Sequence, residues 1–181
     1  PNTGGMGAFS PVPLFTNKIQ DLTLETIIEP TLRELKQNGC TYKGVLYAGL
    51  MIKNGLPHLI EYNVRFGDPE CQVLVARLGA QILDLLLDCS EERLDKAKVN
   101  WSEDHSITVV MASNGYPKNY LTGSEIFNIE KVSAMDGIEV FEAGTAKNGK
   151  KVVANGGRVL NITSSAENLK VAHEKVYNAV K

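Results

Sequence analysis

The sequence of 181 residues lacks the features that mark several classes of protein. Its longest apolar run, residues 82–87, is interrupted by Asp84. That run is far shorter than the roughly 20 residues that a membrane-spanning helix needs. Nineteen Lys and Arg against 21 Asp and Glu leave a formal net charge of −2, so there is no basic excess to attract a phosphate backbone. We therefore predict neither a membrane span nor a nucleic-acid partner.

Cysteine is also scarce, with Cys40, Cys71 and Cys89 widely spaced and no pair in a CxxC pattern. An odd, scattered set argues against both a disulfide framework and a zinc site. This pattern predicts a cytoplasmic protein. The chain opens with PNTGG, without an initiator Met or a signal-like apolar stretch, so we expect it to be part of a longer protein.

Turn residues, polar stretches and hydrophobic periodicity along the chain predict an α+β fold in two parts. The stretch from Ser90 to Asp104 is the most polar, and it divides the chain into domains over 1–96 and 104–181. Upstream, periodicity predicts a helix over 21–38 kinked at Pro30 and a hairpin of strands 44–52 and 57–66 around Asn54-Gly55. Beyond the boundary, it predicts a strand over 106–112, a hairpin over 139–153, a strand over 158–163 and a closing helix. We expect a capping box of Ser164 and Glu167 to open that helix.

The run EYNVRFGDPE, residues 61–70, holds the best candidates for chemistry. Residues two apart on a strand share a face, which places Glu61, Asn63 and Arg65 together and leaves Ile60, Tyr62, Val64 and Phe66 for the core. Carboxylate and amide oxygens suit Mg²⁺, and a guanidinium can bind a phosphate oxygen in a forked arrangement. The alternative is that the three polar residues form only the solvated face of a half-buried strand.

Two residues that follow this strand also have two interpretations. Asp68 precedes a helix that we expect to start at Pro69, so its carboxylate serves as a helix cap, in the site, or in both roles. Cys71 opens the same amphipathic helix and is better explained as a packing residue than as a reactive thiol. Lys150, Lys151 and Arg158 have the chemistry to meet a phosphate, but hairpin charges of this kind are usually solvated.

Five segments, in order along nearly the whole chain, resemble one enzyme family. They are TGGMGAFSP (3–11), YKGVLYAGLMI (42–52), RFGDPECQ (65–72), ITVVMASNGYP (107–117) and GGRVL (156–160). Together they are similar to the phosphoribosylamine-glycine ligase family of purine biosynthesis, within the ATP-grasp superfamily. The resemblance implies the rear half of an ATP-grasp domain, an antiparallel sheet with helices, followed by a small α+β carboxyl-terminal domain.

The resemblance also implies roles for individual residues. Glu61 and Asn63 match the family's metal ligands, for Mg²⁺ or Mn²⁺, and Arg65 matches a catalytic arginine near the transferred phosphoryl group. The glycine-rich loop over residues 3–7 is expected to line the substrate pocket together with Asp68. Its candidate substrate-binding residues are Thr3, Gly4 and Gly5.

The implied reaction joins glycine to 5-phosphoribosylamine, with ATP as co-substrate and glycyl phosphate as intermediate. It yields glycinamide ribonucleotide, ADP and phosphate. A complete ligase of this family also needs an amino-terminal part that clamps adenine, so we expect this chain alone to be inactive. Two alternatives remain, namely another ATP-grasp carboxylate-amine ligase and a non-catalytic binding module derived from such an enzyme.

Overall fold

The computed structural model describes residues 3–181, which form two compact units. One, here called the C-terminal unit, comprises the described residues up to Ser10 together with Asp68–Gly79 and Asn100–Lys181. The other, the hairpin unit, comprises Pro11–Gly67 and Ala80–Val99. The chain therefore makes its last change of unit inside the polar stretch, between Val99 and Asn100. A linear division into 1–96 and 104–181 differs from this arrangement, because two earlier segments pack with the last one.

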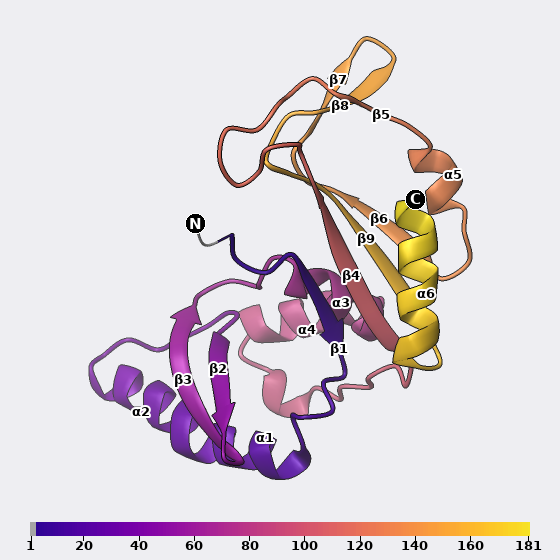
Figure 1. Ribbon diagram of the computed structural model, residues 1–181. Coiled ribbons are helices and arrows are strands. Elements are labelled where there is room, and N and C mark those ends of the chain that lie inside the picture. Colours follow the sequence, from indigo (N-terminus) through magenta and orange to yellow (C-terminus); the bar gives the residue numbers. More distant parts are fainter. Residues whose placement is uncertain (1–2) are drawn as a thin grey trace. The chain divides into compact units, whose positions relative to one another are not determined.

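The C-terminal unit holds two antiparallel sheets, one of four strands in the order β1-β4-β9-β6 and one of three in the order β5-β8-β7 (Figure 1). Its elements are β1 (Gly7–Ser10), α3 (Glu70–Leu78), β4 (His105–Ala112), β5 (Glu125–Ile126), α5 (Ile129–Ser133), β6 (Ile138–Glu142), β7 (Thr145–Asn148), β8 (Lys151–Ala154), β9 (Arg158–Ala166) and α6 (Leu169–Val180). The strand predicted over 106–112 is confirmed as β4, and antiparallel sheets combined with helices confirm the α+β fold class.

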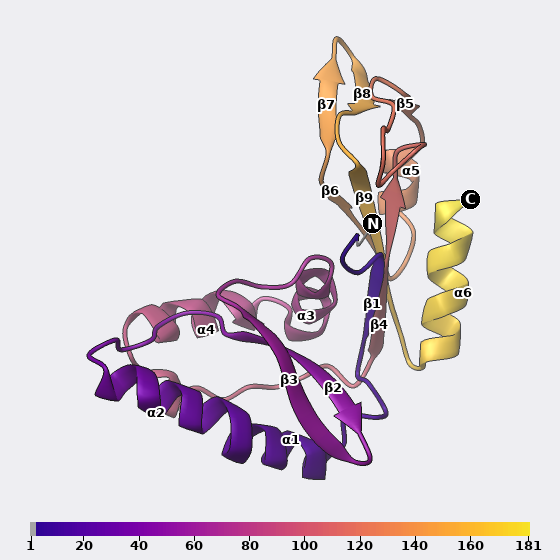
Figure 2. The same cartoon turned by 60° about the vertical axis from the view of Figure 1, so that its left-hand side comes forward.

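The four-stranded sheet is covered on both faces, by α6 on one and by α3 on the other (Figure 2). On the α6 face, Leu160 and Ile162 of β9 form an apolar core with Val176 and Ala179 of the helix. The α3 face carries small polar residues instead, among them the buried Thr108, whose hydroxyl accepts a hydrogen bond of 2.8 Å from Thr163. Burial of both faces makes this sheet the rigid centre of the unit.

Residues 7–10 and 70–78 join this unit through contacts with distant partners. Strand β1 pairs with β4, and α3 packs against β1, β4 and β9. Arg77 of α3 donates from Nη1 to Ser10 Oγ at 2.8 Å and from Nη2 to the Ser102 carbonyl at 2.7 Å. Its guanidinium carbon also lies 5.3 Å from the centre of the Trp101 ring. These pairings join residues that are distant in the sequence and are not expressed in local periodicity.

The hairpin unit consists of one β-hairpin and helices. Its elements are α1 (Asn17–Thr23), the π-helical turn η1 (Leu24–Ile28), α2 (Glu29–Gln37), β2 (Tyr47–Lys53), β3 (Leu56–Asn63), α4 (Gln81–Ser90) and the 3₁₀ turn η2 (Leu94–Lys96). The hairpin predicted around Asn54-Gly55 is confirmed. The helix predicted over 21–38 is interrupted by η1 just before Pro30, which lies in the first turn of α2. A hydrogen bond from Lys43 and its charge lower the pKa of the Glu92 carboxyl, and this pair links the two chain segments of the unit.

The alternation predicted for the second strand is only partly correct. Tyr62 does face the helices, since its hydroxyl lies 2.8 Å from Thr31 Oγ1. Ile60 and Val64, however, are 63% and 74% exposed, so their assignment to the core is wrong. The register shifts by one residue opposite Gly49 and Leu50, which leaves Ile60 without a cross-strand partner, and β3 ends at Asn63 before Val64. A β-bulge of this kind breaks a strict two-residue period.

Two further local predictions are wrong in the C-terminal unit. Residues 139–142 pair with β9, and the hairpin around Asn148-Gly149 contains only β7 and β8. Strand β9 extends to Ala166, so Ser164 is a strand residue whose hydroxyl donates to the Ala172 carbonyl at 2.6 Å. The cap of α6 is Asn168, whose side chain accepts from the Val171 amide at 2.9 Å.

The two candidate caps of α6 predict different effects of mutation. Asn168→Ala removes the observed acceptor and should lower the free energy of unfolding by about 1 kcal/mol. Glu167→Ala, at the exposed neighbouring position, is the matched control and should leave it nearly unchanged. Urea unfolding of both variants measures the difference. A larger loss for Glu167→Ala would favour the capping box.

Candidate active site

The residues singled out from the sequence fall in both units. Glu61, Asn63 and Arg65 belong to the hairpin unit, whereas the glycine-rich loop and Asp68 belong to the C-terminal unit.

Glu61 and Asn63 lie together at the end of β3. Asn63 Nδ2 donates to Glu61 Oε1 at 3.1 Å, so the two side chains extend from the same side of the strand. Glu61 stands opposite Gly49 of β2, where a Cβ atom would lie 3.2 Å from Glu61 Cγ. A glycine at this position therefore leaves room for the carboxylate side chain to lie over the neighbouring strand.

The donor set of this pair fits a hard divalent cation. A carboxylate and an amide offer oxygen ligands, and Mg²⁺ is commonly held by one or two such groups while water and substrate phosphates complete its shell. Within residues 3–181, no group of three or more His, Cys, Asp or Glu side chains is arranged to hold a metal ion. Glu61 and Asn63 would thus supply two of the oxygen ligands of such a cation.

Arg65 lies beyond the end of the strand on which it was predicted. Strand β3 ends at Asn63, and Arg65 lies in the bend that follows. Its side chain is exposed, and its Nη1 donates to the Phe66 carbonyl at 2.9 Å. The two-residue period therefore holds for Glu61 and Asn63 but does not fix the direction of Arg65.

The glycine-rich loop in the C-terminal unit packs closely against its surroundings. The Thr3 hydroxyl donates to the Gly4 carbonyl at 2.8 Å, and the Met6 carbonyl accepts from the Val110 amide at 3.0 Å as β1 begins. A Cβ atom at Gly5 would lie 3.4 Å from Pro69 Cδ. The structure thus brings the loop next to the turn that contains Asp68.

Asp68 does not cap the helix that follows it. The residue at the cap position of α3 is Pro69, and no side chain makes a capping hydrogen bond there. The Asp68 side chain is 56% exposed. Its Oδ1 accepts from Gln72 Nε2 at 3.3 Å, while its Oδ2 lies 3.8 Å from Arg158 Nη1. The capping interpretation is therefore wrong, and the carboxylate stays open to solvent beside the loop.

Cys71 is the second residue of α3 and is partly buried. Burial, and then the nearby charge of Asp68, raise the pKa of its thiol. A raised pKa lowers the thiolate fraction at neutral pH, and the thiolate is the nucleophilic form. This supports the interpretation of Cys71 as a packing residue.

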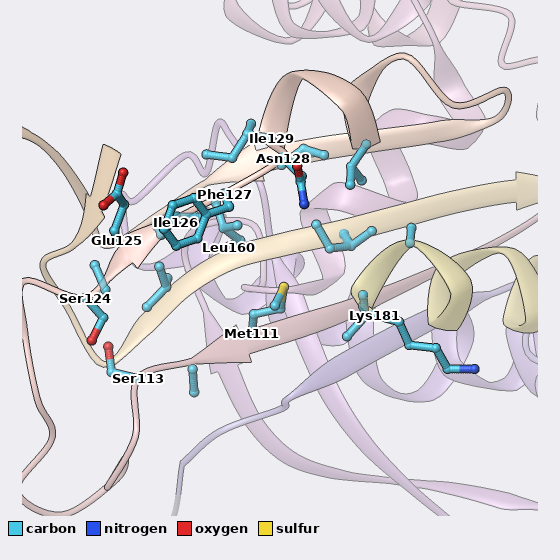
Figure 3. Close-up of a pocket in the computed structure, with 18 of the residues that line it drawn as sticks. Met111, Ser113, Ser124, Glu125, Ile126, Phe127, Asn128, Ile129, Leu160 and Lys181 are labelled. Carbon is cyan, nitrogen blue, oxygen red and sulfur yellow. The ribbon is translucent and has the colours of Figure 1, made fainter. Parts of the chain in front are cut away.

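A cavity of about 490 Å³ lies elsewhere in the C-terminal unit (Figure 3). Its walls are largely apolar and include Met111, Ile126 and Leu160, with the Phe127 ring beside them. None of the residues singled out for chemistry lines it. It lies between the sheet, residues 124–129 and the end of α6, and is separate from the candidate site.

Among residues 3–181, no helix has the length and apolarity needed to span a membrane.

Comparisons with known proteins agree along the chain. Residues 1–71 match the family model for the phosphoribosylglycinamide synthetase ATP-grasp (A) domain, and residues 106–181 match the model for the C domain of the same enzyme. The chloroplastic phosphoribosylamine–glycine ligase of Arabidopsis thaliana is 50% identical over 99% of this chain. The corresponding ligase of Brucella melitensis is 47% identical over 100% of it.

A solved structure supports the same relationship. The crystal structure of phosphoribosylamine–glycine ligase from Thermotoga maritima superposes with a TM-score of 0.84 at 33% identity and covers 99% of this chain and 44% of that one. The chain spans 35% of the Arabidopsis relative and 42% of the Brucella relative. Because both domain models belong to one enzyme and together span most of the chain, this chain belongs to the phosphoribosylamine–glycine ligase family, within the ATP-grasp fold.

Proposed function

We propose that the intact protein containing this chain is a phosphoribosylamine–glycine ligase. It would join glycine to 5-phosphoribosylamine at the expense of ATP and form glycinamide ribonucleotide, ADP and phosphate. The observation that carries this proposal is the Glu61–Asn63 oxygen pair at the end of β3, in a chain that belongs to this family.

The reaction needs an activated carboxylate, because a carboxylate itself is a poor acyl donor. In the proposed sequence the γ-phosphoryl group of ATP passes to the glycine carboxylate, which gives glycyl phosphate and ADP. The amine of 5-phosphoribosylamine then attacks the acyl carbon. A C–N bond forms, the bond to the phosphate oxygen breaks, phosphate leaves, and the nitrogen loses a proton. Such transfers require chiefly positioning and charge stabilisation from the protein.

Glu61 and Asn63 would hold Mg²⁺ or Mn²⁺ through their side-chain oxygens. When bound, the cation would neutralise charge on the phosphates of ATP. The exposed guanidinium of Arg65 would stabilise charge on the transferring phosphoryl group, because it lies two residues beyond this pair and is free of any ion pair in the described residues. No cysteine nucleophile is needed, in keeping with the raised pKa of Cys71.

Thr3, Gly4, Gly5 and Asp68 would contact substrate. Loop carbonyl and amide groups can bind the small polar groups of glycine and of the phosphoribosyl moiety. The Asp68 carboxylate would suit an amine or a hydroxyl. Its exposure and its position beside the loop support this role.

The remainder of the intact protein would cover the hairpin and supply the adenine clamp. An isolated two-stranded hairpin is marginal in water, and this one exposes several large apolar side chains. Met51, Leu56 and Ile60 are 57%, 52% and 63% exposed. We propose that the amino-terminal part of the same enzyme packs on them.

The three free cysteines support a reducing, cytoplasmic location, although the Arabidopsis relative is named as chloroplastic.

The assay for the proposed function uses the intact protein with ATP, Mg²⁺, glycine and freshly prepared 5-phosphoribosylamine. We expect ADP release and glycinamide ribonucleotide formation, both dependent on glycine. Replacing glycine with other amino acids, in parallel reactions, tests the alternative of a different ATP-grasp ligase. Turnover with another acid in preference to glycine would contradict the proposal, as would the absence of any nucleotide hydrolysis linked to ligation.

Loss of either metal ligand should change the dependence on Mg²⁺. Glu61→Gln and Asn63→Ala remove an oxygen donor each, so the half-saturating Mg²⁺ concentration should rise by about tenfold or more. Glu25→Gln, an exposed carboxylate of the same unit, serves as the matched control. Steady-state rates over a Mg²⁺ titration measure the shift. An unchanged Mg²⁺ dependence in both site variants would refute the assignment.

Arg65 should act on the chemical step. Arg65→Ala removes charge stabilisation that develops in the transition state, and kcat should fall by about 100-fold or more with a small change in ATP affinity. Arg33→Ala, which removes an exposed arginine of α2, is the control and should retain kcat. Single-turnover rates and nucleotide binding separate the two effects. A normal kcat in Arg65→Ala would rule out this role.

A further inference from the structure

Arg158 lies where several loop segments of the C-terminal unit meet. It is the first residue of β9, an interior strand of the four-stranded sheet, and its side chain is only 21% exposed. Its Nη2 donates to the Thr3 carbonyl, and its Nη1 donates to the Asp68 carbonyl at 2.9 Å. One guanidinium thus contacts both segments proposed to bind substrate, although they lie 65 positions apart in the sequence.

Neither of these acceptors belongs to a strand or a helix. Thr3 precedes β1, and Asp68 lies between β3 and α3, so no backbone ladder fixes their carbonyl groups. Arg158, in contrast, extends from a strand that is paired on both sides. The planar guanidinium presents five donors in a fixed fork, which allows it to bind two separate carbonyl groups at once. It therefore ties two loops to the rigid sheet.

Tyr116 fixes the guanidinium from a third direction. Its hydroxyl accepts from Arg158 Nε at 3.3 Å and lies 3.4 Å from the Thr3 carbonyl. The segment around Tyr116 is held against the residues that precede Arg158, since Ser113 Oγ donates to the Gly156 carbonyl at 2.7 Å. The orientation of Arg158 is thus set by neighbours, as expected of a group that supports a site.

The identity of residue 4 agrees with this arrangement. Gly4 has φ of +66°, a conformation that favours glycine. A Cβ atom there would also lie 2.7 Å from Arg158 Nη2. Any side chain at this position would push the guanidinium away from the Thr3 carbonyl.

We propose that Arg158, oriented by Tyr116, is a positioning residue that holds the Thr3–Gly5 loop in register with the Asp68 turn. This inference rests on the proposed function, because the two segments are its substrate contacts. Arg158 acts through these segments and not by touching the reacting atoms. Its loss should therefore weaken substrate binding more than it slows the chemical step.

The test compares Arg158→Lys and Tyr116→Phe with wild type in the intact protein. Lysine keeps the charge but presents one nitrogen, which cannot reproduce the fork. We expect faster hydrogen exchange at the amides of residues 4–7 and 66–68. We also expect KM for glycine or 5-phosphoribosylamine to rise by about tenfold, with a smaller change in kcat. Tyr116→Phe removes only the hydroxyl contacts, so it should increase the hydrogen exchange of these residues and KM by smaller amounts.

Arg77→Lys is the matched control in the same unit. Arg77 also joins distant segments by hydrogen bonds from one guanidinium, but it contacts Ser10 and Ser102 and neither substrate segment. This variant should lower the melting temperature while leaving KM and the exchange of residues 4–7 and 66–68 unchanged. If Arg158→Lys does not fold, Tyr116→Phe decides the question by the same measurements.

Two results would overturn the proposal. One is unchanged exchange of both segments in Arg158→Lys, or in Tyr116→Phe where the first variant does not fold. The other is an equal effect of Arg77→Lys on exchange and KM. Failure of the proposed function is seen separately, because wild type would then form no glycinamide ribonucleotide while the exchange measurement still reports on Arg158.

Discussion

The antiparallel pairing of β4 with β9 is the interaction on which the C-terminal unit depends. It places Thr108 opposite Thr163 and Val109 opposite Ile162, residues that lie 55 and 53 positions apart in the chain. Strands β1 and β6 add to its two edges, and α3 and α6 cover its faces. Arg158 begins β9, which is paired on both sides from Leu160 onward, so its backbone is attached to the interior of this sheet.

This constraint gives the scattered motifs a common physical basis. Four motif segments, residues 3–5, 67–69, 114–117 and 156–158, are far apart in the chain. Nevertheless, Thr3, Asp68 and Tyr116 all contact the Arg158 side chain. Loops carry substrate contacts well only when a rigid scaffold fixes them. The glycines, the aspartate turn and the arginine are therefore best understood as one assembly and not as independent features.

The proposed metal ligands, Glu61 and Asn63, depend on a simpler feature, the register of one hairpin. Glu61 and Asn63 are two apart on β3 and share a hydrogen bond, as a strand period of two requires. The hairpin turn at Asn54-Gly55 sets that register locally. This pairing was accessible to sequence reasoning for that reason. Arg65 was less so, because the strand ends before it and a bend has no fixed period.

Sequence by itself determined the elements whose rules are local: the Asn54-Gly55 hairpin, the alternation that unites Glu61 with Asn63, and the family resemblance of the motif runs. Tertiary structure alone decided which segments share a unit, the bulge that exposes Ile60, and the hydrogen bonds that join Arg158 to Thr3 and Asp68. Turn chemistry and periodicity act over a few neighbouring residues. Strand pairing and side-chain bridges between distant residues depend on how the chain returns on itself, and no local pattern specifies that return.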